Sequence, residues 1–246
     1  MIEIKNLSHQ FGPRLILDNI NLSVPVGKVA TIMGSSGGGK TTLLKCVSRL
    51  LTPTKGEITV DGLNAIEDPE GARRKMGMVF QSAALFDFMT VTENVLFGVR
   101  RHKTEKEKSE KDLVAEVLED VGLTPDAGKL MPSELSGGMR KRVGIARAIA
   151  LRPKVMLYDE PTTGLDPVTT YVIDELMVRL ARTQGITTLI VSHDVSSVLR
   201  VSDQIAFLTG GKLVFDGTPA DFETSTQPEI QEIIQKSRAT EFVLTN

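Results

Sequence analysis

The sequence contains no tryptophan, two tyrosines and a single cysteine among its 246 residues. A single cysteine excludes a disulfide within the chain and favours a reducing compartment. No apolar run approaches the roughly 18 residues that a membrane-spanning helix needs. The N-terminus "MIEIKNLSHQF" lacks the basic region and the continuous apolar region of a signal peptide. Any role at a membrane is therefore expected to depend on a partner protein.

An excess of charge of one sign is also missing. The chain has 29 Lys and Arg residues against 31 Asp and Glu residues, for a net charge of -2. Without a basic excess, nucleic acid is not an expected partner. Hydrophobic residues make up 41% of the sequence and charged residues 24%, which is the balance of a globular protein. The length suits one large domain, or one domain that carries a subdomain.

Strand-like runs alternate with helical patterns along most of the chain. "MIEIKNL" and "INLSV" alternate apolar and polar residues as half-buried strands do, and "QIAFLTGGKLVFDG" indicates a hairpin that turns at Gly210–Gly211. "KVATIM", "VMLYDEP" and "TTLIVSHD" indicate buried strands. "TLLKCVSRLL" predicts a helix whose apolar face includes Leu50 and Leu51, and a second helix is expected from about Val168 to Thr183. These patterns predict an α/β fold with a mostly parallel sheet covered on both faces.

A glycine-rich loop follows the first of the buried strands. "GSSGGGKT", from Gly34 to Thr41, fits G-x-x-x-x-G-K-[ST] at every fixed position and lies between a strand and a helix. Glycines allow successive backbone N–H groups to converge on phosphate oxygens. Lys40 brings a charge to the outer phosphates, and the Thr41 hydroxyl can bind Mg²⁺. The alternative is a tight turn, which would not require the lysine and threonine.

Polar side chains end several of the predicted strands. Asp159 can bind Mg²⁺ directly or through water, and Glu160 beside it can orient and polarise an attacking water. The alternative is that both carboxylates cap the next helix. His193 ends a later strand at the same sheet edge, where it can sense a γ-phosphate, although a lone histidine is more often structural. The amide of Gln81, which closes another strand, can reach Mg²⁺ or water.

The stretch "SELSGGMRKR" places two glycines and three cations at the start of a helix, where the macrodipole is already positive. This arrangement is explained if an anion docks there, with Ser136 as the N-cap and with Gly137 and Gly138 beside the anion. One phosphate loop per chain then leaves this second feature to the nucleotide of another copy, in an antiparallel dimer. The alternative is a glycine-softened loop whose cations face solvent.

Together with the phosphate loop, "VMLYDEP" and "SHD", the "LSGG" motif at 135–138 resembles the nucleotide-binding subunit of ABC transporters over about Ile2 to Pro219. The resemblance implies a P-loop NTPase of the ABC ATPase type that binds ATP and Mg²⁺. It implies a nucleotide-binding domain at 1–219, with an antiparallel β region and an inserted helical subdomain at about 83–151. Residues 220–246 would form a C-terminal extension.

The resemblance also implies roles for single residues. Phe11 would stack on adenine, Gln81 would link the γ-phosphate to the membrane partner, and Asp166 would lie in a loop exchanged across the dimer. The implied catalytic residues are Glu160, His193, Lys40 and Gln81, and the implied Mg²⁺ ligands are Thr41, Gln81 and Asp159. The implied nucleotide-binding residues are Phe11, Gly34, Ser35, Ser36, Gly37, Gly38, Gly39, Lys40, Thr41, Thr42, Ser136, Gly137, Gly138 and Asp166.

"LSGGMRKRVGIARAIA" and "EPTTGLDPV" look most like the ATPases of Mce-associated phospholipid transport systems, the Mla and Mkl subgroup. This resemblance implies a phospholipid cargo, integral membrane permease subunits, MCE-domain and STAS-domain components, and a place on the cytoplasmic face of the inner membrane. Two alternatives are an importer ATPase for amino acids or another small solute, and a soluble ABC protein. Met139 stands where the family usually has glutamine.

The tail has an apolar stripe of its own. Ile230, Ile233 and Ile234 fall on one face of a short predicted helix in "QPEIQEIIQKS". The last residues, "EFVLT", add three apolar side chains at the terminus. Because a short helix is marginal alone, we expect the tail to pack on a neighbour, the other ATPase copy. Disorder is the alternative.

Overall fold

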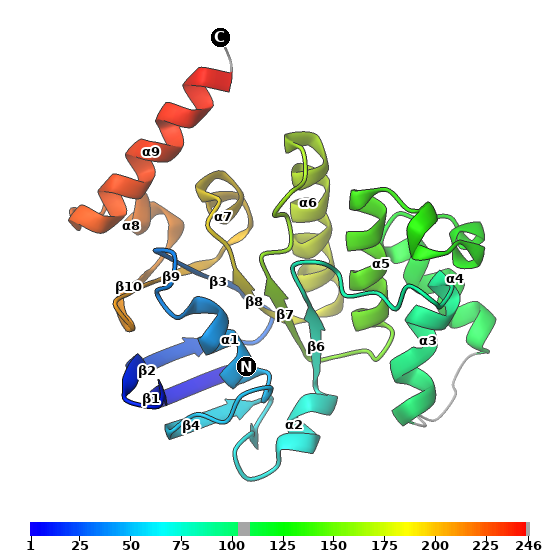
Figure 1. The fold of residues 1–246 in the computed structure, drawn as a ribbon, viewed down its shortest axis with the longest axis horizontal. Coiled ribbons are helices and arrows are strands. Elements are labelled where there is room, and N and C mark those ends of the chain that lie inside the picture. Colours follow the sequence, from blue (N-terminus) through cyan, green and yellow to red (C-terminus); the bar gives the residue numbers. More distant parts are fainter. Residues whose placement is uncertain (103–108, 245–246) are drawn as a thin grey trace.

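The structure is a computed structural model that describes residues 1–102 and 109–244, with side chains described up to residue 237. Within these ranges the chain forms two β-sheets and a group of helices that extends to one side of them (Figure 1). None of the helices described is long and apolar enough to cross a lipid bilayer. The layered arrangement confirms the α/β class that the alternation of strands and helices predicts.

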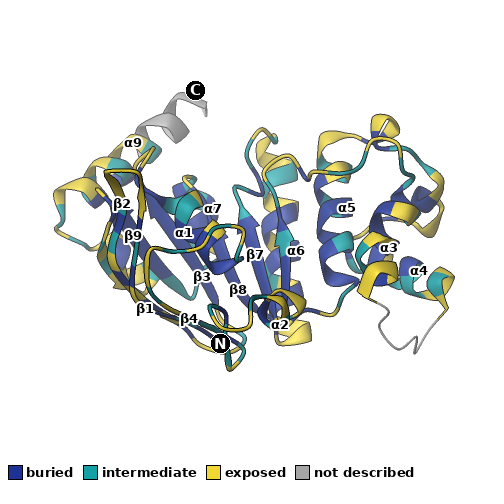
Figure 2. Cartoon of the chain, turned by 60° about the horizontal axis from the view of Figure 1, so that its bottom comes forward, coloured by how far each residue is buried: buried dark blue, intermediate teal, exposed yellow. Residues whose placement is uncertain are grey.

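Five strands of the larger sheet run parallel, and a sixth is antiparallel at one edge. In spatial order the strands are β10 (Lys212–Gly217), β9 (Gln204–Thr209), β3 (Val29–Gly34), β8 (Thr187–Val191), β7 (Val155–Asp159) and β6 (Met76–Val79). Every residue of β3 and β8 is buried (Figure 2), as expected for strands covered on both faces. The β9–β10 hairpin turns at Gly210 and Gly211, which both adopt positive φ as a tight hairpin turn requires.

The smaller sheet is antiparallel and confirms the predicted antiparallel β region. Its spatial order is β2 (Arg14–Val24), β1 (Ile2–Phe11), β4 (Lys55–Val60) and β5 (Leu63–Asn64). The alternating apolar residues of these strands pack with helix α1 (Lys40–Val47) against one face of the larger sheet. The helix is shorter than predicted: it ends at Val47, Arg49 turns the chain with φ 58°, and Leu50 is exposed.

Helices cover the other face of the larger sheet. Helix α6 (Pro167–Gln184) matches the predicted helix and ends at Gly185, whose φ of 63° is the left-handed conformation that suits glycine. Helix α7 (Val195–Val201) follows β8. Neighbouring residues of β7 therefore face different cores: Leu157 packs with α1, whereas Met156 and Tyr158 pack with α6.

The helices between residues 91 and 149 form the group on the right of Figure 1. They are α3 (Val91–His102), α4 (Glu110–Asp120) and α5 (Gly137–Ile149), with two short 3₁₀ turns at Pro125–Lys129 and Pro132–Glu134. They fall inside the range 83–151 predicted for a helical subdomain. Their apolar residues belong to the same buried cluster as those of α6 and β7, so this part of the chain is continuous with the sheet through its core. The remaining short helix before β6 is α2 (Pro69–Arg74).

The packing of the C-terminal helices contradicts one prediction from the sequence. After α8 (Pro219–Glu223), helix α9 (Pro228–Leu244) places Ile230 and Ile234 in a buried cluster with Phe207 and Phe222 of the same chain. Ile233 is partly buried against the same cluster. For these isoleucines the prediction of packing on a second copy is therefore wrong, whereas the side chains of "EFVLT" lie outside the described residues. The isoleucines pack there because α7, α8 and β9 form an apolar surface that α9 covers within its own chain.

Candidate active site

The phosphate loop, residues 34–42, connects β3 to α1 and needs its glycines for two physical reasons. A Cβ on Gly34 would lie 1.8 Å from the carbonyl oxygen of Leu208, so no side chain fits there. Gly39 adopts φ 102° and would meet Leu17 at 2.9 Å if it carried a Cβ. The loop therefore curves tightly against the sheet and brings its backbone N–H groups to the N-terminus of α1, where an anion is favoured.

Lys40 curls back over this loop. Its Nζ donates hydrogen bonds to the carbonyl oxygens of Gly34 and Ser35, both at 2.9 Å. Burial lowers the pKa of Lys40, and the nearby carboxylates of Glu160 and Asp159 oppose that shift. The ammonium group is thus held inside the curve of the loop, between the loop backbone and two acidic residues. This is a position from which it can meet the outer phosphates of a nucleotide.

Thr41 and Asp159 supply oxygen atoms suited to Mg²⁺. The Thr41 hydroxyl donates to Asp159 Oδ1 at 3.4 Å, which joins the first turn of α1 to the end of β7. Burial raises the pKa of Asp159, while the hydrogen bond from Thr41 favours the charged form. The described residues contain no cluster of three or more His, Cys, Asp or Glu side chains that could hold a metal. Mg²⁺ held by one hydroxyl and one carboxylate would take its other ligands from water and phosphate oxygens, which fits its known preferences.

Strand register brings the other polar residues to the same sheet edge. In the pairing of β6, β7 and β8, Val79 is opposite Tyr158 and Asp159 is opposite Val191. The residues that follow these positions therefore leave the sheet side by side. They include Gln81 after β6, Glu160 after β7 and His193 after β8.

Glu160 is the centre of a hydrogen-bonded group. His193 Nδ1 lies 2.6 Å from Glu160 Oε2, and the Thr163 hydroxyl donates to the same oxygen at 2.7 Å. Glu160 adopts φ 50°, a conformation that costs of the order of 1–3 kcal/mol in a residue other than glycine and that persists only where its surroundings hold it. Its backbone N–H donates to the Val191 carbonyl oxygen at 2.9 Å, which supplies such a constraint. A carboxylate fixed in this way can accept a hydrogen bond from an attacking water.

Thr163 is a residue that the sequence reasoning missed. It lies three positions after Glu160, on the turn that leads to α6. Threonine and serine hydroxyls frequently bond to groups two to four residues away in such turns, so this spacing was an available signal.

Ser136 caps α5, and Gly137 and Gly138 are its first residues, as predicted. The Ser136 hydroxyl accepts a hydrogen bond from the Met139 N–H at 3.3 Å. A Cβ on Gly138 would lie 2.7 Å from the Thr169 side chain, and Thr169 in turn donates its N–H to Asp166, the cap of α6, at 3.0 Å. The structure thus places the "LSGG" motif beside the loop of Leu165 and Asp166 within one chain.

The three cations of this turn have partners within the chain. Arg140 donates to the Leu135 carbonyl oxygen at 2.8 Å, and Arg142 donates to that of Gly122 at 3.2 Å. Lys141 is buried and donates to the carbonyl oxygen of Gln81. The cations therefore bind carbonyl groups that lie around the helix, and an anion is not needed to explain them. Met139 is partly buried against the core shared with the helices.

Phe11 lies at the end of β1, where the chain turns through Gly12. Its ring is 52% exposed and makes a T-shaped contact with the His9 ring, with centroids 4.7 Å apart. An exposed aromatic ring held by a buried neighbour is available for stacking on a base.

Comparison with known proteins agrees with this geometry. The sequence pattern of the family described as "ABC transporter" matches residues 17–163. The chain is 45% identical over 222 residues to the intermembrane phospholipid transport system ATP-binding protein MlaF of Haemophilus influenzae, covering 89% of this chain and 84% of that one. It is 42% identical over 241 residues to the glutamine transport ATP-binding protein GlnQ of Escherichia coli, covering 96% and 99%.

A solved structure shares the fold. The dimeric post-hydrolysis state of the ATP-binding cassette MJ0796, bound to ADP and Pi, superposes with a TM-score of 0.79 at 32% identity. The match covers 89% of this chain and 99% of that chain. With a phosphate loop, a carboxylate-histidine pair at one sheet edge and relatives matched over most of their length, this chain belongs to the ABC transporter family, as an ATP-binding subunit with ATPase activity.

Proposed function

We propose that the chain binds MgATP at the phosphate loop and hydrolyses it with Glu160 as the residue that orients water. The contact of 2.6 Å between Glu160 and His193 is the observation that carries this proposal, because it lies at the strand end next to Lys40. Glu160 accepts a hydrogen bond from the water and polarises it toward the γ-phosphorus. The water oxygen bonds to the γ-phosphorus and gives its proton to Glu160, while the bond from that phosphorus to the β-phosphate oxygen breaks, and ADP and phosphate leave.

The other residues bind and hold the substrate. Lys40 and the loop N–H groups bind the β- and γ-phosphates, Phe11 stacks on adenine, and His193 reads the γ-phosphate with the ring that Glu160 orients. Gln81 approaches the γ-phosphate from the end of β6. Mg²⁺ held near Thr41 and Asp159 would neutralise charge that develops on the phosphates.

The proposed functional unit is a dimer of two copies. Ser136, Gly137 and Gly138 of one copy would close on the nucleotide that the phosphate loop of the other copy holds, with Asp166 at the exchanged loop. The dimeric state of MJ0796 supports this arrangement. In this dimer, the phosphates of the partner's nucleotide would also be an anion for the exposed N-terminus of α5 to bind.

Glu160→Gln tests the catalytic assignment. The amide keeps the shape of the side chain but is a poor base, so turnover should fall by about 10²–10⁴-fold while ATP still binds. In this variant, addition of MgATP should produce a dimer that stays associated during size-exclusion chromatography. Turnover equal to that of the parent protein would show that Glu160 does not activate the water.

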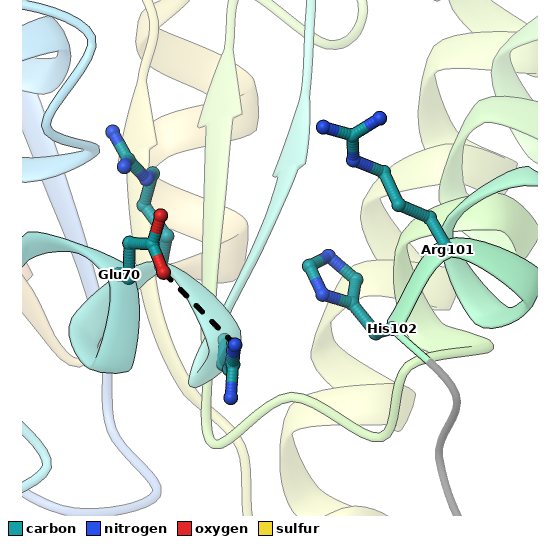
Figure 3. A pocket seen from close by; sticks show the side chains of 5 residues that line it. Glu70, Arg101 and His102 are labelled. Atoms are coloured by element: carbon teal, nitrogen blue, oxygen red, sulfur yellow. Dashed lines mark ion pairs between the residues drawn. The ribbon is translucent and has the colours of Figure 1, made fainter.

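A cleft between α2 and α3 is the proposed docking place for a permease (Figure 3). Its volume is about 490 Å³, and its lining residues are Glu70, Arg73, Arg74, Arg101 and His102. Nearby, the side-chain atoms Nε and Nη1 of Arg49 have no hydrogen-bond partner among the described residues, and Arg73 donates to the Arg49 carbonyl oxygen at 3.4 Å. This excess of arginine suits an acidic cytoplasmic segment of a membrane partner.

Helix α3 connects this cleft to an exposed aromatic group. Phe97, 41% exposed, is four residues from Arg101 and therefore on the same helix face. Its ring centroid lies 4.6 Å from that of Phe86, and Phe88, in the same segment after Gln81, is 76% exposed. An apolar group beside a basic cleft is typical of a protein interface.

Phospholipid is the proposed cargo, within a complex on the cytoplasmic face of the inner membrane that includes MCE-domain and STAS-domain subunits. The similarity to MlaF and the "LSGGMRKRV" stretch support this proposal. The second candidate is an importer of amino acids or another small solute, which the match to GlnQ over 99% of its length favours. Cargo does not touch the ATPase, so the site geometry fits both.

Purification of the tagged chain from detergent-solubilised membranes separates the two cargo candidates. Phospholipid transport predicts an MCE-domain companion and bound phospholipid by mass spectrometry, whereas a solute-binding companion would favour the importer. Arg101→Glu should reduce recovery of the permease, because it reverses charge in the cleft. Lys212→Glu makes the same charge change on β10 and serves as the control. Equal recovery in both variants would remove the cleft from the interface.

A further inference from the structure

Helix α5 holds the segment that follows β6 by three separate contacts. Lys141 donates to the carbonyl oxygen of Gln81. A Cβ on Gly144 would lie 3.2 Å from Ala83, so the two backbones approach closely. Arg147 donates to the carbonyl oxygens of Ala83 and Ala84, at 2.8 Å and 2.7 Å. The residues 141, 144 and 147 lie on one face of the helix, which therefore follows the segment along its length.

The segment held in this way has an unfavourable backbone conformation. Ala83 adopts φ 61° and Ala84 adopts φ 48°. Two successive left-handed residues with side chains are uncommon and persist only where their surroundings constrain them. The carbonyl oxygens that Arg147 binds belong to these two residues. The path of the chain from Gln81 to Ala84 thus depends on α5.

Lys141 differs from its two cationic neighbours on the helix. Only 7% of its surface is exposed, and it reaches a segment 60 residues away in the sequence. Burial lowers the pKa of Lys141, and the negative charge of Glu160 opposes that shift. The ammonium group therefore lies within the electrostatic influence of the carboxylate that we assign to water activation. It is connected by one hydrogen bond to the backbone at Gln81 and by four residues of helix to Gly137.

We propose that Lys141 is a positioning residue that connects the first turn of α5 to the loop that contains Gln81. When Gly137 and Gly138 of one copy close on the partner's nucleotide, this connection sets the position of Gln81 in the site of that same copy. The second statement rests on the proposed dimer. Lys141 is buried beside the turn that docks, and it donates to a carbonyl oxygen of its own chain. Each copy would therefore read the nucleotide of the other through this lysine. Loss of this connection should leave ATP binding intact and uncouple the loop from α5.

Hydrogen exchange of the full-length chain measures this connection directly. Lys141→Met keeps most of the length of the side chain but removes its hydrogen-bond donor. In this variant, amides in peptides covering 80–85 should exchange about tenfold faster, as loss of a charge-assisted hydrogen bond predicts. Amides of 143–149 should be unchanged. Arg142→Met is the matched control, because its guanidinium donates to a carbonyl elsewhere, at Gly122. Its exchange at 80–85 should equal that of the parent.

Turnover then measures the consequence. Lys141→Met should lower kcat about tenfold, in proportion to the lost hydrogen bond, with an ATP dissociation constant within a factor of two of the parent. Lys141→Gln keeps a neutral donor on a shorter side chain, so its exchange at 80–85 and its kcat should lie between those of the parent and the methionine variant. It also keeps the test decisive if the methionine variant does not fold.

Two results would overturn the inference. In the first, a folded Lys141 variant exchanges at 80–85 as slowly as the parent. In the second, exchange accelerates selectively but kcat is unchanged. The exchange comparison without nucleotide does not depend on dimer formation, and Glu160→Gln tests the catalytic carboxylate separately. Failure of the proposed function and failure of this inference are therefore distinguishable.

Discussion

Replacing Tyr158 with phenylalanine is expected to increase the free energy of unfolding, because the hydroxyl of Tyr158 is buried without a partner in the part of the chain that the structure describes. Tyr158 is fully buried between β7 and the helices, and its oxygen has no hydrogen-bond partner among the described residues. Burial raises the pKa of this hydroxyl, so it is neutral at all ordinary pH values. A buried polar group without a partner costs about 1–3 kcal/mol, whereas the ring itself packs in an apolar core. Tyr158→Phe removes the cost and keeps the ring.

The expected gain follows from these terms. Removing one oxygen leaves a small void, so we take the lower end of the range, about 1 kcal/mol. At roughly 2.1 cal/mol/K per residue, unfolding of a chain of this length has an entropy near 0.5 kcal/mol/K. A gain of about 1 kcal/mol then raises Tm by about 2 °C. Scanning calorimetry and urea unfolding, both without nucleotide, measure this shift.

Tyr171→Phe is the matched control for the same chemical change. Tyr171 is 51% exposed, and the Arg200 guanidinium lies 5.0 Å from the centroid of its ring, a contact that phenylalanine retains. Its unfolding free energy should change by less than about 0.5 kcal/mol, as is usual at the surface. A loss of stability in Tyr158→Phe would refute the reasoning, because it would mean that the hydroxyl has a favourable interaction in the native protein.

Two further substitutions test the site and the tail. Thr163→Val removes the hydroxyl that donates to Glu160 Oε2 and should lower kcat about tenfold without weakening ATP binding. Steady-state kinetics and nucleotide titration measure the two effects. A kcat equal to that of the parent would mean that Glu160 does not need this hydrogen bond. Ile230→Ala should cost about 2–4 kcal/mol by urea unfolding, because Ile230 is fully buried, and more than Ile233→Ala at the partly buried neighbour. Equal small effects would place the stripe outside the core.

Local patterns were sufficient to predict most of the sheet. The strands around Ile32, Leu157 and Ile190 are short apolar runs bounded by turn residues, and all three were found as buried parallel strands. The phosphate loop could be predicted because its glycines, lysine and threonine fall within the eight consecutive residues Gly34 to Thr41, between an apolar strand and a helix. Each of these features is decided within about ten residues of sequence.

The remaining features depend on contacts between distant segments. Lys141 and Gln81 are 60 residues apart, and only the packing of α5 on the end of β6 makes them neighbours. The isoleucines of α9 have a helical pattern, but the pattern does not say which apolar surface they cover. The exposed Leu50 likewise has the spacing of the helix before it, although the chain has already turned at Arg49. A pattern predicts an element, whereas its partner is decided by the fold.

Three of the eight non-glycine residues that adopt positive φ in the described structure lie where the proposed chemistry takes place. Val79 and Tyr158 are paired across β6 and β7, and within five residues of these positions Ala83, Ala84 and Glu160 adopt left-handed conformations. The two alanines are held by hydrogen bonds from Arg147 of α5. The side chain of Glu160 is held by His193 from the end of β8 and by Thr163 three residues further along its own turn. Because a strained segment relaxes when its constraint moves, a small shift of α5 can change the loop after β6, and a shift of His193 can change the loop after β7. The two strand ends therefore form a region that nucleotide binding and helix movement can bias together.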